Sequence, residues 1–122
     1  MFKNKFSIGD ILEGTNRKFN EAYHYVVFYA GNTDDDFCGG FITTSPKYQN
    51  IPMKSEHFES GHKIGYTNSY LAAHKFIKLK DWGPYKKVGR LSKEGIEFLE
   101  QNIGHLEPEL YTDYALRLLN NR

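Results

Sequence analysis

Hydroxyl side chains followed by a lysine form the part of the sequence best suited to chemistry on a phosphate. Thr44 and Ser45 end a hydrophobic run, and Lys47 comes two residues after Ser45. Serine and threonine hydroxyls donate hydrogen bonds to phosphate oxygens, and a lysine ammonium compensates the charge that grows during phosphoryl transfer. The run therefore predicts a phosphate site, although a strand end followed by an ordinary Ser-Pro turn accounts for the same residues.

A histidine at the start of a strongly hydrophobic run is the candidate acid or base. His24 opens the run His-Tyr-Val-Val-Phe, and an imidazole titrates near neutral pH, as general acid–base catalysis requires. The flanking Tyr23 and Tyr25 can stack on bases or polarise a phosphate. The alternative for all three side chains is packing within a half-buried strand.

A basic stretch interleaved with aromatic residues is a candidate surface for single-stranded nucleic acid. Residues 63–93 hold eight lysines and arginines against one acid, Asp81. Single strands are usually bound by cations that follow the backbone and by rings that stack on bases. A solvated strand edge that lysines protect is the alternative. The candidate contacts in this stretch are Lys78, Lys80, Lys86 and Lys87.

Composition predicts one intracellular domain without a cofactor. The chain has 122 residues, which suits a single hydrophobic core. Its one cysteine, Cys38, cannot form an internal disulfide, so we expect a reducing compartment and a cytoplasmic protein. No segment reaches membrane-spanning length, and the five histidines lack the spacing of metal ligands. We therefore expect no membrane contact, no metal site and no cofactor.

Alternating apolar residues and turn signals predict short strands followed by two helices. The strongest strand covers 22–30 and should be central, because both of its alternating faces are apolar or aromatic. Ser92 is the expected N-cap of a helix over about 92–103, with Gly104 as its C′ glycine, and a second helix covers about 108–120. The remaining expected strands are 11–14, 37–44, 53–58, 63–67 and 75–80.

This succession of elements predicts an α+β fold class, mainly β with C-terminal helices. We expect a single domain over 1–122, built as a small SH3-like barrel over about 8–91 with the helical end lying across it. Gly39 and Gly40 inside the predicted strand 37–44 indicate the bulge or sharp coil that small barrels need.

Five segments, taken in order, resemble the MazF/PemK-like toxin superfamily of SH3-like barrels. They are residues 9–11 (GDI), 24–28 (HYVVF), 40–47 (GFITTSPK), 70–78 (YLAAHKFIK) and 87–92 (KVGRLS). Residues 44–47 also look like the Thr-Ser-x-Lys element of the related endoribonuclease toxins that RNA antitoxins control. Together the segments cover roughly residues 8 to 104, and their succession is more specific than any one of them.

The resemblance implies a metal-independent endoribonuclease, in which a ribose 2′-hydroxyl attacks the adjacent phosphate and leaves a cyclic phosphate. Carried over residue by residue, Thr44 and Ser45 would hold the scissile phosphate and Lys47 would stabilise its charge. His24 or a neighbouring tyrosine would handle the proton. The implied partners are single-stranded RNA, a protein or RNA antitoxin, and a second copy of the chain in a homodimer.

One position departs from the family pattern. MazF-like enzymes usually carry an arginine just before the Val-Val strand, where this chain has Ala22, Tyr23 and His24. The loop residues Arg17 and Lys18 are the available substitutes and join the candidate RNA contacts. The alternatives are a non-catalytic SH3-like barrel that binds nucleic acid or a protein partner, and a barrel that poisons a protein target, as gyrase-directed relatives of this fold do.

Overall fold

Eight short strands form one sheet in the computed structural model, which describes residues 6–14, 24–31, 37–44, 46–47, 49–59, 69–78 and 85–120. The expected strand 63–67 lies outside these residues. The strands are β1 (Asp10–Gly14), β2 (His24–Gly31), β3 (Phe37–Thr43), β4 (Ile51–Pro52), β5 (Tyr70–Leu71), β6 (Phe76–Lys78), β7 (Lys86–Arg90) and β8 (Glu109–Leu110). The helical elements are the 3-10 turn η1 (Ser55–His57), α1 (Lys93–Ile103) and α2 (Tyr111–Asn120).

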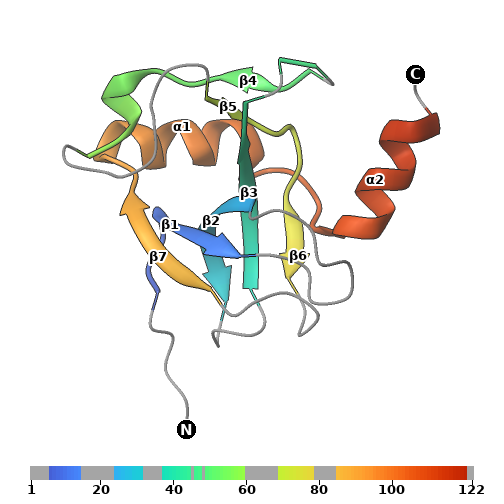
Figure 1. The fold of residues 1–122 in the computed structure, drawn as a ribbon, viewed down its shortest axis with the longest axis horizontal. Coiled ribbons are helices and arrows are strands. Elements are labelled where there is room, and N and C mark those ends of the chain that lie inside the picture. Colours follow the sequence, from blue (N-terminus) through green and yellow to red (C-terminus); the bar gives the residue numbers. More distant parts are fainter. Residues whose placement is uncertain are drawn as a thin grey trace, which may run out of the picture.

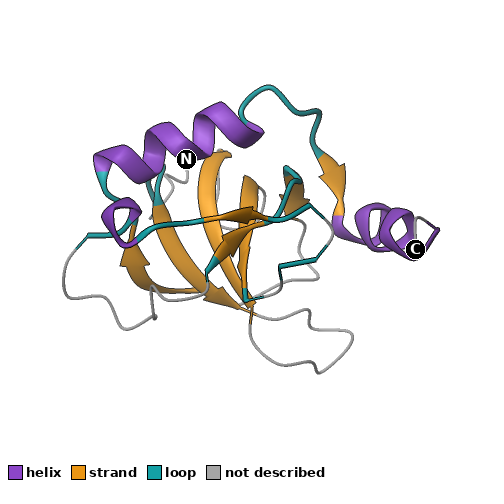
Figure 2. Ribbon diagram, turned by 90° about the horizontal axis from the view of Figure 1, so that it is seen from above, coloured by secondary structure: helices purple, strands orange, loops and turns teal. Residues whose placement is uncertain are grey.

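The sheet is antiparallel along its main path, in the order β4-β5-β3-β2-β1-β7. β6 also pairs with β3, and β8 joins β6 in parallel. Figures 1 and 2 show α1 along one face of the curved sheet and α2 beyond the side that carries β6. An isolated bridge between Phe58 and Leu91 ties the segment after β4 to the end of β7. The chain is therefore mainly β with C-terminal helices, which confirms the predicted α+β class.

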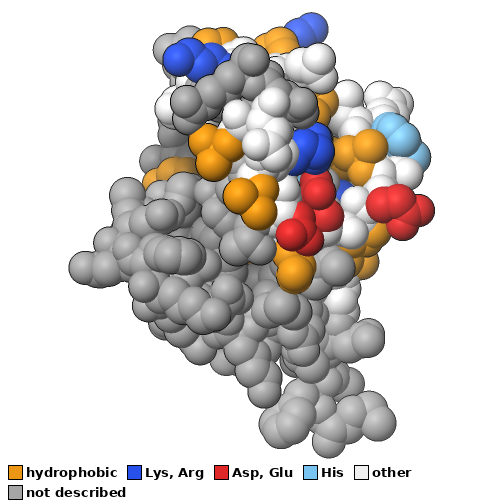
Figure 3. Space-filling view, turned by 90° about the vertical axis from the view of Figure 1, so that its right-hand side faces the viewer, with side chains coloured by type: hydrophobic (Ala, Val, Ile, Leu, Met, Phe, Trp, Pro, Cys, Tyr) orange, Lys and Arg blue, Asp and Glu red, His pale blue; other side chains and the backbone are white. Residues whose placement is uncertain are grey.

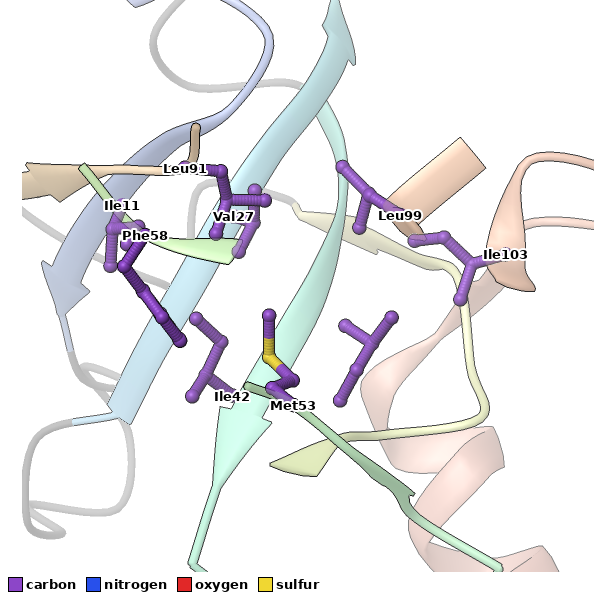
Figure 4. Close-up of a cluster of buried hydrophobic side chains, with 9 residues drawn as sticks. Ile11, Val27, Ile42, Met53, Phe58, Leu91, Leu99 and Ile103 are labelled. Carbon is purple, nitrogen blue, oxygen red and sulfur yellow. The ribbon is translucent and has the colours of Figure 1, made fainter. Parts of the chain in front are cut away.

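β2 is the centre of the sheet because both of its faces are buried. Val27 lies in a first cluster between the sheet and α1, whereas Val26 and Phe28 lie in a second cluster on the opposite face. Val26 and Val27 have no exposed surface, which confirms the prediction of a central strand with two apolar faces. The first cluster, drawn in Figure 4, is Ile11, Val27, Ile42, Met53, Phe58, Leu71, Leu91, Leu99 and Ile103. The second cluster is Leu12, Val26, Phe28, Phe37, Phe41, Ala72 and Tyr114.

Hydrogen bonds to the segment around η1 fix the start of α1. Ser92 caps the helix as predicted: its Oγ accepts from the Gly95 N–H at 3.1 Å and donates to the Glu56 carbonyl at 2.6 Å. The Ser92 N–H donates to the His57 carbonyl at 2.9 Å. Because α1 approaches η1 this closely, Gly95 has no room for a side chain. A Cβ at Gly95 would lie 2.0 Å from the His57 carbonyl oxygen.

We expect Gly95→Ala to destabilise the protein, although alanine inside a helix is ordinarily more stable than glycine by ~1 kcal/mol. The added methyl group forces α1 away from η1, so the free energy of unfolding should fall by about 2 kcal/mol. Urea unfolding followed by circular dichroism measures the change. The control is Gln101→Ala on the exposed face of the same helix, which should stay within ~0.5 kcal/mol of the wild type. A Gly95→Ala protein as stable as the wild type would contradict the close approach.

The expectation of a strand over 53–58 is wrong. Ser55–His57 form the 3-10 turn η1 because His57 folds back on Lys54. The Lys54 N–H donates to His57 Nδ1 at 3.0 Å, and the His57 N–H donates to the Lys54 carbonyl at 2.9 Å. These local bonds compete with strand pairing and leave Phe58 with a single bridge to Leu91.

The helical region differs from the prediction in two places. Gly104 follows α1 with a right-handed backbone (φ −57°, ψ −33°), so it is not a left-handed C′ glycine. Its lack of a side chain instead allows close packing, because a Cβ there would lie 2.5 Å from the Glu100 carbonyl oxygen. The second helix begins at Tyr111 rather than near Pro108, because Glu109–Leu110 pair with β6 as β8.

Among the described side chains of α2, Tyr114 packs into the core. Tyr114 is 7% exposed in the second cluster, so this tyrosine packs in the core rather than at an open interface. Leu116 and Leu119 of the same helix are exposed. Figure 3 views this side of the molecule and shows hydrophobic side chains at the surface near acidic ones. Among the described helices, none is long and apolar enough to cross a membrane.

Candidate functional site

Six strands each place one end along the same border of the sheet, the border that the strand ends form. Because β1 and β3 run antiparallel to β2, their ends lie beside the start of β2, as the arrowheads in Figure 4 show. The starts of β5 and β7 and the end of β4 lie there as well, since β5 pairs with β3, β7 with β1 and β4 with β5. We call this the site edge. Its paired positions are Gly14 with His24, Tyr25 with Ile42, Thr43 with Tyr70, and Glu13 with Lys86.

The site edge brings two of the predicted catalytic residues onto neighbouring strands. His24 is the first residue of β2, and Thr44 directly follows β3 with an exposed side chain. Continuing the register by one residue from the Tyr25–Ile42 pair sets His24 opposite Thr43. Neighbouring strands lie about 4.8 Å apart, so the backbones of His24 and Thr44 lie close together at the site edge.

A tight turn after β3 carries Lys47, the third predicted catalytic residue that the structure describes. Ser45, the fourth, lies outside the described residues. The Lys47 side chain is exposed, and its carbonyl accepts from the Asn50 N–H at 3.1 Å. Gln49 inside this turn has a φ of 62°, a left-handed backbone that is uncommon for a residue with a side chain. The turn is therefore a constrained segment next to the candidate site.

We expect Gln49→Gly to relieve the left-handed strain in this turn. Left-handed backbone costs an L-residue about 1 kcal/mol, and glycine avoids that cost, so Gln49→Gly should keep or raise the free energy of unfolding. Gln49→Val should lower it by about 1 kcal/mol or more, because a β-branched residue tolerates this backbone worst. Urea unfolding of both variants against the wild type tests the pair. A valine variant as stable as the glycine variant would contradict the observed turn.

The candidate RNA contacts other than Lys78 fall into three groups in the structure. Lys86 and Lys87 are exposed on β7, and Lys86 lies at the site edge. Tyr25 is half-buried and packs against the first cluster, as the packing alternative for this tyrosine predicts. The others lie outside the described residues: Arg17, Lys18, Tyr23 and Lys80.

Lys78 lies at the opposite ends of the strands from the site edge. It pairs with Phe37 at the start of β3, whereas the site edge is at the end of that strand. At about 3.3 Å per residue, the two ends of β3 are ~20 Å apart. The structure therefore does not bring Lys78 together with Thr44 and His24.

A buried carboxylate organises the basic residues of β7. Asp10 is 2% exposed, and its Oδ2 accepts from the Ser7 N–H at 2.8 Å. Its Oδ1 accepts from Arg90 Nη1 at 2.6 Å and lies 3.2 Å from Lys87 Nζ. Arg90 Nε also lies 3.6 Å from Glu59 Oε2. The sequence does not predict this network, because a strand-opening aspartate 80 residues before its arginine carries no local signal.

Another group of ionisable side chains joins α2 to the sheet. The His74 side chain has no exposed surface, and its ring stacks on Tyr114 with 3.9 Å between centroids and on Phe41 with 6.0 Å. His74 Nδ1 lies 3.0 Å from Glu109 Oε1, which also accepts a hydrogen bond from Arg117. Because the ring is enclosed between two aromatic side chains, this group docks α2 and is not open to a substrate.

Burial sets the ionisation of this group. It lowers the pKa of His74 to about 4, although the hydrogen bond and charge of Glu109 oppose the shift. Burial raises the pKa of the Glu109 carboxyl, but the hydrogen bonds and charges of Arg117 and His74 outweigh it, so that pKa is lowered. At pH 7 His74 is therefore a neutral imidazole next to the ionised carboxylate of Glu109. Nδ1 of His74 carries the ring proton and donates a hydrogen bond to Glu109 Oε1.

The buried His74 should make stability depend on pH between about 6.5 and 4. Below pH 6.5 the unfolded histidine takes up a proton that the folded one, with its pKa of about 4, excludes, so stability falls as the pH falls. Between pH 7 and pH 5 this histidine should cost about 2 kcal/mol of unfolding free energy. Urea unfolding at both pH values measures it, and His74→Phe should lose most of that difference. The exposed control His105→Gln should keep it. Equal pH dependence in His74→Phe and the wild type would contradict this origin.

Two other reactive side chains lie among the described residues. Cys38 is a half-buried free thiol in β3. His57 stacks on Phe98 with 4.2 Å between ring centroids. Within the part of the chain that the structure describes, no three histidine, cysteine, aspartate or glutamate side chains are grouped so that they could hold a metal ion.

The fold and the site edge define a small α+β domain with a polar sheet edge beside a basic strand. Comparison with known proteins gives no matching family model, no matching curated protein and no matching solved structure.

Proposed function

We propose that the chain is a metal-independent endoribonuclease that cleaves single-stranded RNA at the site edge, as the toxin of a toxin–antitoxin pair. The observation that supports this is the register of β2 and β3, which sets His24 at the start of β2 opposite Thr43, the residue before Thr44. An SH3-like barrel is the proposed architecture. The bridge between Phe58 and Leu91 supports it by joining the β4 side of the sheet to β7.

The proposed reaction is an internal transesterification. The ribose 2′-oxygen bonds to the adjacent phosphorus while the P–O5′ bond breaks, which leaves a 2′,3′-cyclic phosphate and a free 5′-hydroxyl. His24 accepts the proton from the 2′-hydroxyl, and the departing O5′ takes a proton from water. The hydroxyls of Thr44 and Ser45 donate to the non-bridging oxygens, and the Lys47 ammonium compensates the charge that develops on them.

In the proposed function, Lys86 binds RNA at a distance from the bond that breaks. β7 lies three strands from β3 in the sheet order, a separation of ~14 Å at about 4.8 Å per strand. At that distance a lysine cannot reach the reacting phosphate, but it can bind the phosphate of a neighbouring nucleotide. The basic strand then contributes affinity, and the residues of β2 and β3 contribute the chemistry.

The test is cleavage of an end-labelled single-stranded RNA in the presence of EDTA. We expect products with cyclic phosphate ends, and a rate at least about 100-fold lower for His24→Ala and for the Thr44→Ala/Ser45→Ala double variant. Lys93→Ala removes an exposed lysine at the start of α1 and should cleave at the wild-type rate. RNA of varied sequence left intact, or a double variant as active as the wild type, would exclude this function.

A non-catalytic RNA-binding domain is the second candidate. Fewer groups are left for catalysis, because Tyr25 packs against the first cluster and Lys78 lies far from the site edge. Lys86 at the site edge has only to bind RNA in this second candidate. RNA affinity that falls steeply with salt, without any cleavage product, would favour this candidate. Binding to a protein that salt does not weaken would favour an interaction domain or a protein-directed toxin.

A further inference from the structure

Three cations of β7 differ in what surrounds them. Arg90 and Lys87 share the Oδ1 of Asp10, at 2.6 Å and 3.2 Å, and Arg90 also lies near Glu59. These two cations and two carboxylates have formal charges that sum to zero. Lys86 is exposed, and within the described residues no carboxylate forms an ion pair with it. Its cross-strand neighbour Glu13 is half-buried.

Moving Lys87 from Asp10 to a phosphate is unfavourable because Asp10 is buried. The Lys87 side chain is 50% exposed, whereas the Asp10 side chain is 3% exposed. If the ammonium left, water could not replace it on a carboxylate with so little accessible surface. A phosphate that bound Lys87 would gain one ion pair while the protein lost another, so little free energy would be gained.

We infer that Asp10 withholds Lys87 and Arg90 from RNA, so that Lys86 is the residue through which β7 binds the RNA backbone. The inference rests on the proposed RNA-binding function and deepens it. Two adjacent lysines on one strand thus have different roles: Lys86 binds phosphate, and Lys87 holds β7 to the start of β1. Asp10 limits the RNA affinity of this strand.

The experiment compares Lys86→Ala, Lys87→Ala and Asp10→Asn in binding a 20-nucleotide 2′-O-methyl oligouridine, which cannot be cleaved. Fluorescence anisotropy gives the affinity between about 0.05 and 0.5 M KCl. Each phosphate contact on a single strand contributes ~0.7 to the slope of log affinity against log salt. The slope for Lys86→Ala should therefore be shallower by ~0.7. Between 1 M and 0.1 M salt, its affinity should rise about fivefold less than that of the wild type. Lys87→Ala should match the wild type.

Asp10→Asn should bind more tightly than the wild type, with a slope steeper by ~0.7, because it releases one cation charge. The double variant Asp10→Asn/Lys87→Ala should return to the wild-type slope. If Asp10→Asn does not fold, the two lysine variants, which retain Asp10, still decide the question. Circular dichroism of every variant confirms that the fold is kept.

The outcomes separate this inference from the proposed function. Equal losses in Lys86→Ala and Lys87→Ala would overturn the inference while leaving RNA binding intact. An Asp10→Asn protein with unchanged affinity and slope would also overturn it. If neither the wild type nor Asp10→Asn binds the oligonucleotide, the inference and the RNA function both fall. Binding by Asp10→Asn alone would support withholding by Asp10 and exclude RNA as the ligand of the natural sequence.

Discussion

The burial of β2 on both faces is the constraint on which the rest of the structure depends. Val26 and Val27 are consecutive residues with no exposed surface, so each side of the strand must be covered by other elements. α1 covers one side through the first cluster, and Tyr114 of α2 contributes to the second cluster on the other side. The pairing of β2 with β1 and β3 then fixes which strand ends meet. The site edge is a consequence of that pairing.

The charges near the two apolar clusters act mainly to hold elements together. Asp10 joins β1 to β7 through Arg90 and Lys87, and Glu109 joins β8 to α2 through Arg117. In both cases a carboxylate with restricted access to water is matched by cations that reach solvent, a pairing that costs less than burying both charges. The basic composition of residues 63–93 therefore overstates the positive charge available to a polyanion, because part of it is neutralised within the protein.

The site was predictable only in part. The Thr-Ser-x-Lys run and His24 are local patterns, and the structure brings the start of β2 with His24 and the end of β3, just before Thr44, to the site edge. Lys78 and Lys86 belong to the same basic stretch, yet the structure puts them at different edges, because β6 pairs with the start of β3 and β7 pairs with β1. The Asp10 network was not predictable, since its members come together only when β1 pairs with β7.

The sequence by itself determined the fold class, the two-faced central strand and the N-cap at Ser92, because alternation, propensity and capping are properties of neighbouring residues. The sequence pattern predicted a strand at 53–58, where hydrogen bonds between Lys54 and His57 form a turn instead. It did not predict β5 and β7, which have no clear alternation and form by pairing with β3 and β1. Only the tertiary structure decided which cations remain available at the site edge. The physical reason is that an ion pair depends on distance through space, and residues 10 and 87 are brought within 3.2 Å by the sheet alone.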